Sequence, residues 1–167
     1  MLTDFTATDL AYNIVEQLLV GKIDGTTISA HVVAGGRAGS KKPGAVNPLL
    51  ANNPYATRIK KAGNRSGGPL IMGKYRLKTH ESQATWIRLE PFADNDMHGR
   101  AGFAIHGRGA RGSDGCIVPT DFNLVQTIYA LVKGRETAIK PAVTLAVVAI
   151  GDLDSVEQRL RQWGEIA

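Results

Sequence analysis

The stretch FAIHGRGARGSDGCIVPT, residues 103–120, contains the only cysteine of the chain and organises the sequence around it. The apolar run AGFAIHG predicts a short strand that ends at His106. A loop of nine residues with four glycines then leads to Cys116, and a helical pattern follows. This order allows two interpretations of His106 and Cys116: a nucleophilic thiol with its base, or a buried cysteine near an unrelated histidine.

The rest of the pattern predicts an α+β fold that is mainly β, with an antiparallel or mixed sheet. The segments that predict strands are 18–36, with a turn at Asp24-Gly25, and 69–80, 85–93 and 142–150. The apolar residues of 11–19 also fit a helical stripe. A helix of about a dozen residues is expected after Thr120 as its N-cap, with Gly134 as its stop, and 153–165 predicts a closing helix. Residues 35–68 are rich in Gly, Pro, Asn and Ser, which predicts a long functional surface loop.

Length and composition predict one domain over residues 1–167, because 167 residues with 43% apolar composition can bury one core. No segment approaches the roughly 18 consecutive apolar residues of a membrane span, and the first ten residues lack the basic region of a secretory signal. We therefore expect a chain made in the cytoplasm, without a signal peptide and without membrane insertion. A single cysteine forms no internal disulfide, and with histidines available it is a candidate nucleophile.

The formal charge of +5 is concentrated in residues 58–111, which hold eleven Lys or Arg against four acids. A basic face attracts nucleic acid, anionic membrane or an acidic small substrate, and it can also be a solvated surface. The aromatic residues of this segment do not cluster as a stacking platform, so nucleic acid is not the expected partner.

The opening stretch contains the parts of a cysteine nucleophile. A thiol reacts as its thiolate, and a nearby base that a third group orients makes the thiolate available. The glycines let the loop fold back so that His106 and Cys116 meet. Gly115 frees local N–H groups to face a developing oxyanion, with the amide of Cys116 as the natural donor. Arg108 and Arg111 are placed to lower the thiol pKa or to bind a carboxylate.

Two other interpretations of this region are weak. The glycines at 107, 109 and 112 match a dinucleotide-binding string, but no helix begins there and no acidic residue follows in a βαβ unit. Metal binding would use His98, His106, Asp114 and Cys116, whose spacing matches no closed zinc pattern. We therefore expect neither a metal nor a cofactor.

Several motifs resemble those of the YkuD-type L,D-transpeptidases, whose signature is a His-Gly pair, a loop and then Ser/Thr-x-Gly-Cys. The closer resemblance is to the DUF2778 branch, which contains the type VI secretion effectors called Tlde1. The motifs that carry it are Gly68-Pro69, Gly73-Lys74-Tyr75-Arg76, GRAGFAIHG at 99–107 and SDGCIV at 113–118. The resemblance covers about residues 30–133. It implies a YkuD-like catalytic domain with a sandwich of mixed or antiparallel sheet, a helix after the cysteine and a C-terminal helix.

The chain departs from the larger YkuD families in three respects. Asp114 stands where those families have a histidine before the Gly-Cys pair. Val118-Pro119 stand where they commonly have an arginine, and the loop from His106 to Cys116 is shorter, as in the effector branch.

The resemblance implies a role for each matching residue. Cys116 would attack the carbonyl of diaminopimelate, the third residue of a peptidoglycan stem, and expel the terminal D-alanine. His106 would accept the thiol proton, Gly107 would orient the imidazole through its carbonyl, and Ser113 would hold the loop. Water or an amine would resolve the thioester, which gives L,D-carboxypeptidase action, a cross-link or D-amino-acid exchange.

Substrate-binding candidates are the cationic residues that suit stem carboxylates, together with two residues within the motifs. They are Arg100, Arg108, Arg111, Asp114 and Tyr75. The resemblance also implies an antibacterial effector that is secreted into the periplasm of a target cell, with an immunity protein and a component of the secretion machine as partners. The alternatives are a housekeeping cross-linking enzyme, a cysteine endopeptidase with the same dyad, and a catalytically silent basic binding module.

Overall fold

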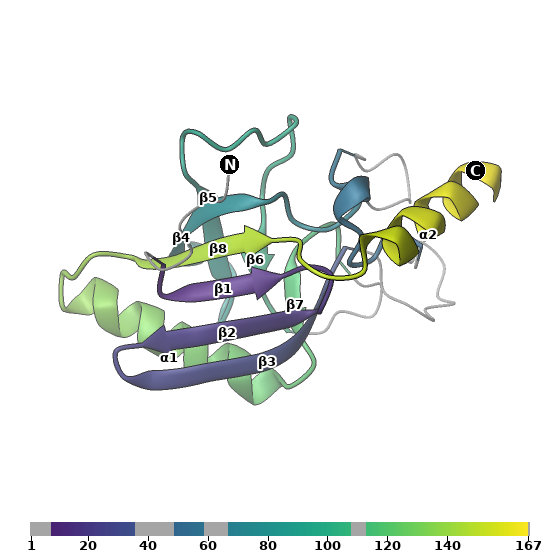
Figure 1. The fold of residues 1–167 in the computed structure, drawn as a ribbon. Coiled ribbons are helices and arrows are strands. Elements are labelled where there is room, and N and C mark those ends of the chain that lie inside the picture. The colour runs from purple at the N-terminus through teal and green to yellow at the C-terminus, as the bar shows by residue number, and fades with distance from the viewer. Residues whose placement is uncertain (1–7, 36–48, 59–66, 108–112, 167) are drawn as a thin grey trace.

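Eight strands close into a mixed β-barrel (Figure 1). The computed structural model describes residues 8–35, 49–58, 67–107 and 113–166. Around the barrel the order is β1-β2-β3-β7-β6-β5-β4-β8. The strands are β1 (Leu10–Asn13), β2 (Leu18–Ile23), β3 (Thr26–Ala34), β4 (Gly73–Thr79), β5 (Ile87–Pro91), β6 (Ala104–Ile105), β7 (Ile117–Pro119) and β8 (Val143–Val148).

Most of the predicted strands are confirmed. The β2–β3 hairpin turns at Asp24 and Gly25, whose φ angles of 46° and 81° are the positive values that a tight two-residue hairpin requires. β4, β5, β6 and β8 lie within the segments that alternate or run apolar. Two strands were not predicted: β1, because its residues adjoin a helical stripe, and β7, because three residues carry no period.

The predicted sandwich is wrong, because the sheet closes on itself. Two parallel pairs, β1 with β8 and β6 with β7, complete a ring whose other neighbours are antiparallel. β1 and β8 lie more than 130 residues apart in the chain, so no local pattern announces their pairing. The inward side chains form one core, including Leu10, Leu19, Val32, Leu77 and Leu145.

The helix α1 (Phe122–Thr137) follows β7 and adds Val125, Ile128 and Val132 to the core. Its N-cap is Asp121, whose side chain accepts the amide of Asn123. The prediction of Thr120 as the cap and Gly134 as the stop is therefore wrong. Thr120 bonds instead to the carbonyl of His31, and Gly134 lies inside a helix of 16 residues.

The predicted surface loop is also wrong where the structure describes it. In residues 49–58, Leu50 and Ala51 are buried beside a short 3-10 helix, η2 (Pro54–Ala56). Asn53 caps η2 and donates to the carbonyl of Val156 in α2 (Leu153–Ile166). The predicted closing helix is thus confirmed, and it extends beyond the barrel (Figure 1). The rest of the predicted loop, 36–48 and 59–66, lies outside the described residues.

Candidate active site

The β6–β7 pair places the cysteine and the histidine on one face. Ile105 and Ile117 are paired in parallel and are fully buried, so both face the core. Side chains alternate across a strand, and His106 and Cys116 are therefore directed to the outer face. The amide of His106 donates to the carbonyl of Ile117 at 3.1 Å, which fixes this register. The thiol and the imidazole that lay ten residues apart in the sequence thus line one pocket.

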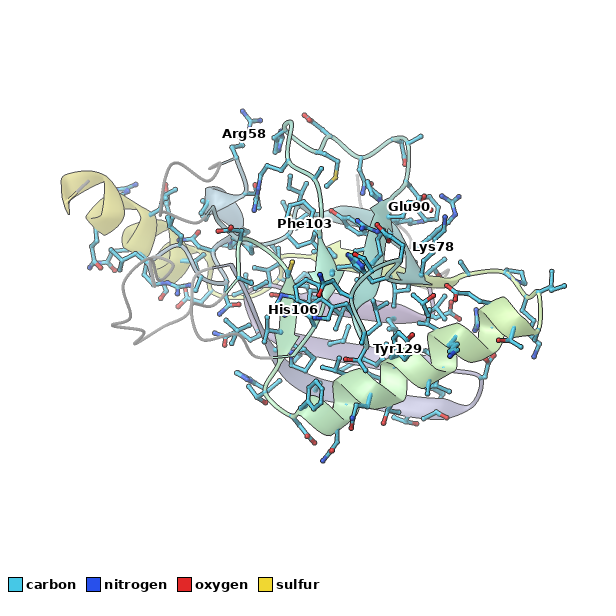
Figure 2. The ribbon with its side chains drawn as sticks, turned by 180° about the vertical axis from the view of Figure 1, so that it is seen from behind. Arg58, Lys78, Glu90, Phe103, His106 and Tyr129 are labelled. Carbon is cyan, nitrogen blue, oxygen red and sulfur yellow. The ribbon has the colours of Figure 1, made fainter. Side chains whose placement is uncertain are left out.

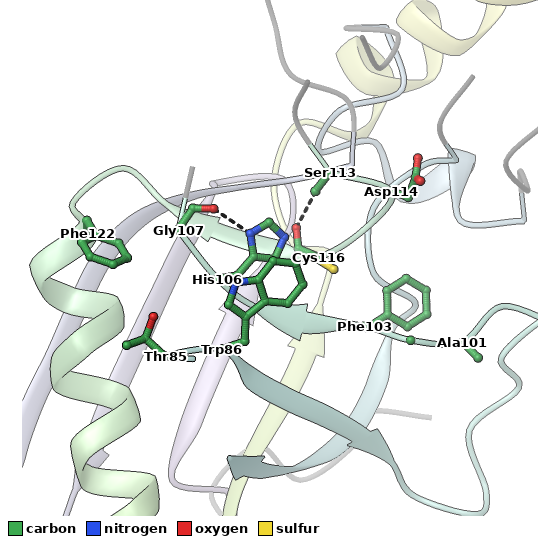
Figure 3. A pocket seen from close by; sticks show the side chains of 11 residues that line it. Thr85, Trp86, Ala101, Phe103, His106, Gly107, Ser113, Asp114, Cys116 and Phe122 are labelled. Carbon is green, nitrogen blue, oxygen red and sulfur yellow. Dashed lines mark hydrogen bonds between the residues drawn. The ribbon is translucent and has the colours of Figure 1, made fainter. Parts of the chain in front are cut away.

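The imidazole of His106 is oriented on two sides. Its Nδ1 lies 2.6 Å from the carbonyl oxygen of Gly107, so Nδ1 carries the hydrogen and Nε2 is left as an acceptor. The indole of Trp86 stacks on the ring at a centroid distance of 4.1 Å and an interplanar angle of 13°. Figure 3 shows the Nε2 edge turned toward the Cys116 side of the pocket. Burial lowers the pKa of His106, and the bond to Gly107 opposes this in part, so the imidazole is neutral at neutral pH.

The thiol of Cys116 is half-buried and free of any disulfide. Burial raises its pKa, and the negative charge of Asp114 raises it further. The amide of Ala104, the positive charge of Arg100 and the amide of Cys116 itself lower it in part. At rest the thiol and the imidazole are therefore both neutral, and a thiol in this state can act as a nucleophile only when a base accepts its proton.

Ser113 and Gly115 shape the turn that carries the thiol. The Ser113 hydroxyl donates to the carbonyl of Cys116 at 2.8 Å and also lies 3.3 Å from the carbonyl of Gly35. Gly115 has a φ of +115°, a backbone conformation that residues with a side chain rarely adopt. A Cβ at Gly115 would lie 2.5 Å from the ring of Phe103, so only glycine fits there.

The pocket is an open cavity of about 690 Å³ with aromatic walls (Figure 3). Trp86, Phe103 and Phe122 line it together with the predicted His106, Gly107, Ser113, Asp114 and Cys116. Sequence reasoning missed the three aromatic walls, because each belongs to a segment that reads as an ordinary strand or helix. Phe122 begins the helical stripe in the sequence, and only the structure shows that it is 48% exposed whereas Val125 and Ile128 are buried.

Two of the predicted substrate-binding residues have other partners. The guanidinium of Arg100 is directed to backbone carbonyls, and the residue is only 9% exposed. Tyr75 is fully buried, and its hydroxyl donates to the carbonyl of Ile71 at 2.6 Å. Neither residue is among those that line the pocket, and their assignment to substrate binding stays a prediction. Arg108 and Arg111 lie outside the described residues.

Three cations of the basic segment have partners within the fold where the structure describes it. Lys78 pairs with Glu90 at 2.8 Å across β4 and β5, and Figure 2 shows the two side chains together. Arg88 pairs with Glu81. Arg76 stacks on the ring of Phe92 at 4.0 Å. These contacts use the cations within the fold, so this segment offers less free positive charge than its composition predicts.

The described ranges contain no group of three or more His, Cys, Asp or Glu residues that would hold a metal ion. None of the described helices is both long and apolar enough to cross a membrane. A scan of the chain against models of known protein families gives no match. A search of curated proteins gives none either. Because neither comparison gives a match, a reaction for this pocket can be inferred only from its geometry and from the motifs of the sequence.

Proposed function

We propose that the protein is a cysteine-dependent L,D-transpeptidase or L,D-carboxypeptidase that acts on the tetrapeptide stems of peptidoglycan. The observation that carries the proposal is that Cys116 and His106 line one pocket, with Nδ1 of His106 bonded to Gly107 and Nε2 left as an acceptor. The motifs around these two residues, which resemble the YkuD-type family and its effector branch, supply the substrate class.

In the first half-reaction, Sγ of Cys116 attacks the carbonyl carbon of the diaminopimelate residue. The thiol proton passes to Nε2 of His106 as the S–C bond forms. The carbonyl oxygen becomes an oxyanion that the amide of Cys116 stabilises. The C–N bond to D-alanine then breaks, and His106 returns the proton to the leaving amine. The product is a thioester on Cys116 and free D-alanine.

In the second half-reaction, an acceptor attacks the thioester. Water yields a tripeptide stem, and an amine yields a cross-link or an exchanged D-amino acid. His106 accepts the proton of the acceptor and returns it to the departing thiolate. The same two residues therefore serve both steps, with their roles reversed.

The pocket suits a peptide stem. Its volume of about 690 Å³ lies within the range of small-ligand sites. The rings of Trp86, Phe103 and Phe122 provide apolar contact for the aliphatic side chains of a stem. Arg108 and Arg111 remain the predicted partners of the stem carboxylates.

The resemblance to the effector branch extends the proposal to the biological setting. The enzyme would be an antibacterial toxin of type VI secretion, active in the periplasm of the target cell and held inactive by an immunity protein in the producing cell. The same chemistry in a housekeeping cross-linking enzyme is the alternative.

Incubation with purified disaccharide tetrapeptide tests the activity. We expect mass spectrometry to detect released D-alanine and a thioester adduct on Cys116, and expect Cys116→Ala to give neither. Added D-methionine should yield exchanged stems if an amine is accepted. Cleavage at another bond would identify an endopeptidase, and no release with no adduct would leave a silent binding module.

A further inference from the structure

Arg100 is the buried cation beside the nucleophile, and its guanidinium contacts three separate segments of the chain. Nη1 donates to the carbonyls of Thr57 at 2.6 Å and Pro69 at 2.8 Å. Nη2 donates to the carbonyls of Gly68 at 2.7 Å and Asp114 at 3.0 Å. Four N–H donors thus hold η2's flank, the Gly68-Pro69 motif and the turn before Cys116 in one arrangement.

Burial of this guanidinium costs free energy unless hydrogen bonds replace those that it made with water. Burial of a guanidinium carries a desolvation penalty, which several charge-assisted hydrogen bonds must offset. Burial accordingly lowers the pKa of Arg100. A lysine has one compact ammonium and cannot place donors on four carbonyls in a plane. The fork of an arginine is therefore specific to this arrangement.

The guanidinium also packs directly on the turn of the nucleophile. A Cβ on Gly115 would lie 2.6 Å from Nη2 of Arg100 and 3.1 Å from the carbonyl of Gly68. The Cζ of Arg100 lies 5.0 Å from the centre of the Phe103 ring, which would also meet a Cβ on Gly115. The peptide between Asp114 and Cys116 thus rests on Arg100 and Phe103 and has little freedom to shift.

The charge of Arg100 acts on the thiol as its position beside the turn predicts. The positive charge of Arg100 acts on Cys116, where it opposes the effects of burial and of Asp114 on the thiol. A fixed positive charge near the sulfur favours the thiolate that forms during attack.

We propose that Arg100 is a positioning residue for the nucleophile: its guanidinium binds the carbonyl of Asp114, fixes the turn through Gly115, and places a positive charge near Sγ of Cys116. The inference rests on the proposed function only for the reaction that it serves. Its test uses the thiol itself. Cys116 is the only cysteine, so the rate of alkylation by iodoacetamide against pH reports on this sulfur alone.

Two variants separate charge from geometry. For Arg100→Gln we expect the alkylation profile to move to higher pH by about one pH unit, which is about tenfold lower reactivity at neutral pH. For Arg100→Lys we expect the profile to recover in part, because the charge is kept. Release of D-alanine should stay low in both, with a loss in kcat rather than KM, because the turn is no longer held.

Arg159→Lys is the matched control, because Arg159 is a partly buried arginine that also donates to backbone carbonyls, those of Ala51 and Asn52. We expect it to keep the wild-type profile. A wild-type profile in folded Arg100→Gln overturns the proposal and leaves a purely structural role. If Arg100→Gln does not fold, a wild-type profile and kcat in Arg100→Lys overturn it. A shifted profile without D-alanine release from the wild type would sink the proposed substrate and leave the role of Arg100 intact.

Discussion

Trp86 lies flat on His106, and the ring of His80 packs against the same indole in a T-shaped arrangement, at a centroid distance of 5.9 Å and an angle of 80°. The stack keeps solvent from one face of the imidazole and holds its plane. The orientation of the imidazole therefore depends on Trp86, the residue that immediately precedes β5 and that no motif identified.

Replacement of Trp86 should change the pH dependence of the reaction. Burial lowers the pKa of His106, so its exposure in Trp86→Ala should raise that pKa and move the acid limb of the kcat/KM profile to higher pH. We also expect a loss on the order of 10²-fold in kcat/KM, because the base is less well placed. NMR titration of the imidazole and a pH profile of D-alanine release measure both effects. Trp86→Phe retains an aromatic face, so its pH profile should lie between those of the wild type and Trp86→Ala. An acid limb that does not move in Trp86→Ala would contradict the role of the stack.

The identity of the base can be tested with two histidines of the same region. His106→Ala should lower kcat by about 10³-fold, because the thiol is protonated at rest and loses its proton acceptor. His98 bonds to Asp96 at 3.1 Å and does not line the pocket, so His98→Ala should retain near-wild-type activity. Steady-state kinetics with the tetrapeptide compares them. Equal losses in both variants would show that the base has been misassigned.

Asp114 acts on the thiol through its charge. Burial is the main cause of the raised pKa of Cys116, and Asp114 adds to it. Asp114→Asn should therefore lower the pKa of Cys116 and speed alkylation at neutral pH several-fold. Asp114→Ala removes the same charge and should behave alike in this assay. A difference between the two in D-alanine release would assign the side chain a contact with the substrate, and no change in alkylation would exclude the charge effect.

Gly115 should tolerate no side chain. Gly115→Ala combines a φ of +115° with a Cβ 2.5 Å from Phe103 and 2.6 Å from Arg100, so we expect loss of activity and a lower free energy of unfolding. Gly102 also has a positive φ, of 83°, but a Cβ there would meet nothing within 4 Å. Gly102→Ala should cost about 1–3 kcal/mol from backbone strain alone. Urea unfolding measures both variants, and equal costs would mean that packing at the turn is not tight.

The stability of the barrel should fall in acid because of Asp9. Burial raises the pKa of this carboxyl, but hydrogen bonds from Thr144 and Arg135 outweigh it, and the net pKa lies below 3.8. A carboxyl with a lowered folded pKa stabilises the protein above its unfolded pKa, and this stability is lost as the pH falls through the folded value. Asp9→Asn should cost about 1–2 kcal/mol at pH 7 and flatten the loss below pH 4. Urea titrations from pH 2 to 7 test this, and parallel curves for both proteins would contradict it.

The sequence alone predicted the elements whose signals are local. Alternation identified β4 and β5, the Asp24-Gly25 pair fixed the β2–β3 hairpin, and the motifs singled out His106 and Cys116. These signals are short-range, because they depend on side-chain period and on the φ angles that particular residues allow.

Tertiary structure decided how those elements meet. The parallel pairing of β1 with β8 and of β6 with β7 closes a barrel where a sandwich was expected. Packing also placed Trp86 on His106 and enclosed the guanidinium of Arg100 among backbone carbonyls. From the sequence, Arg100 was predicted to be a cation that binds substrate. Contacts between distant segments depend on which surfaces bury one another best, and no local pattern in the chain encodes that choice.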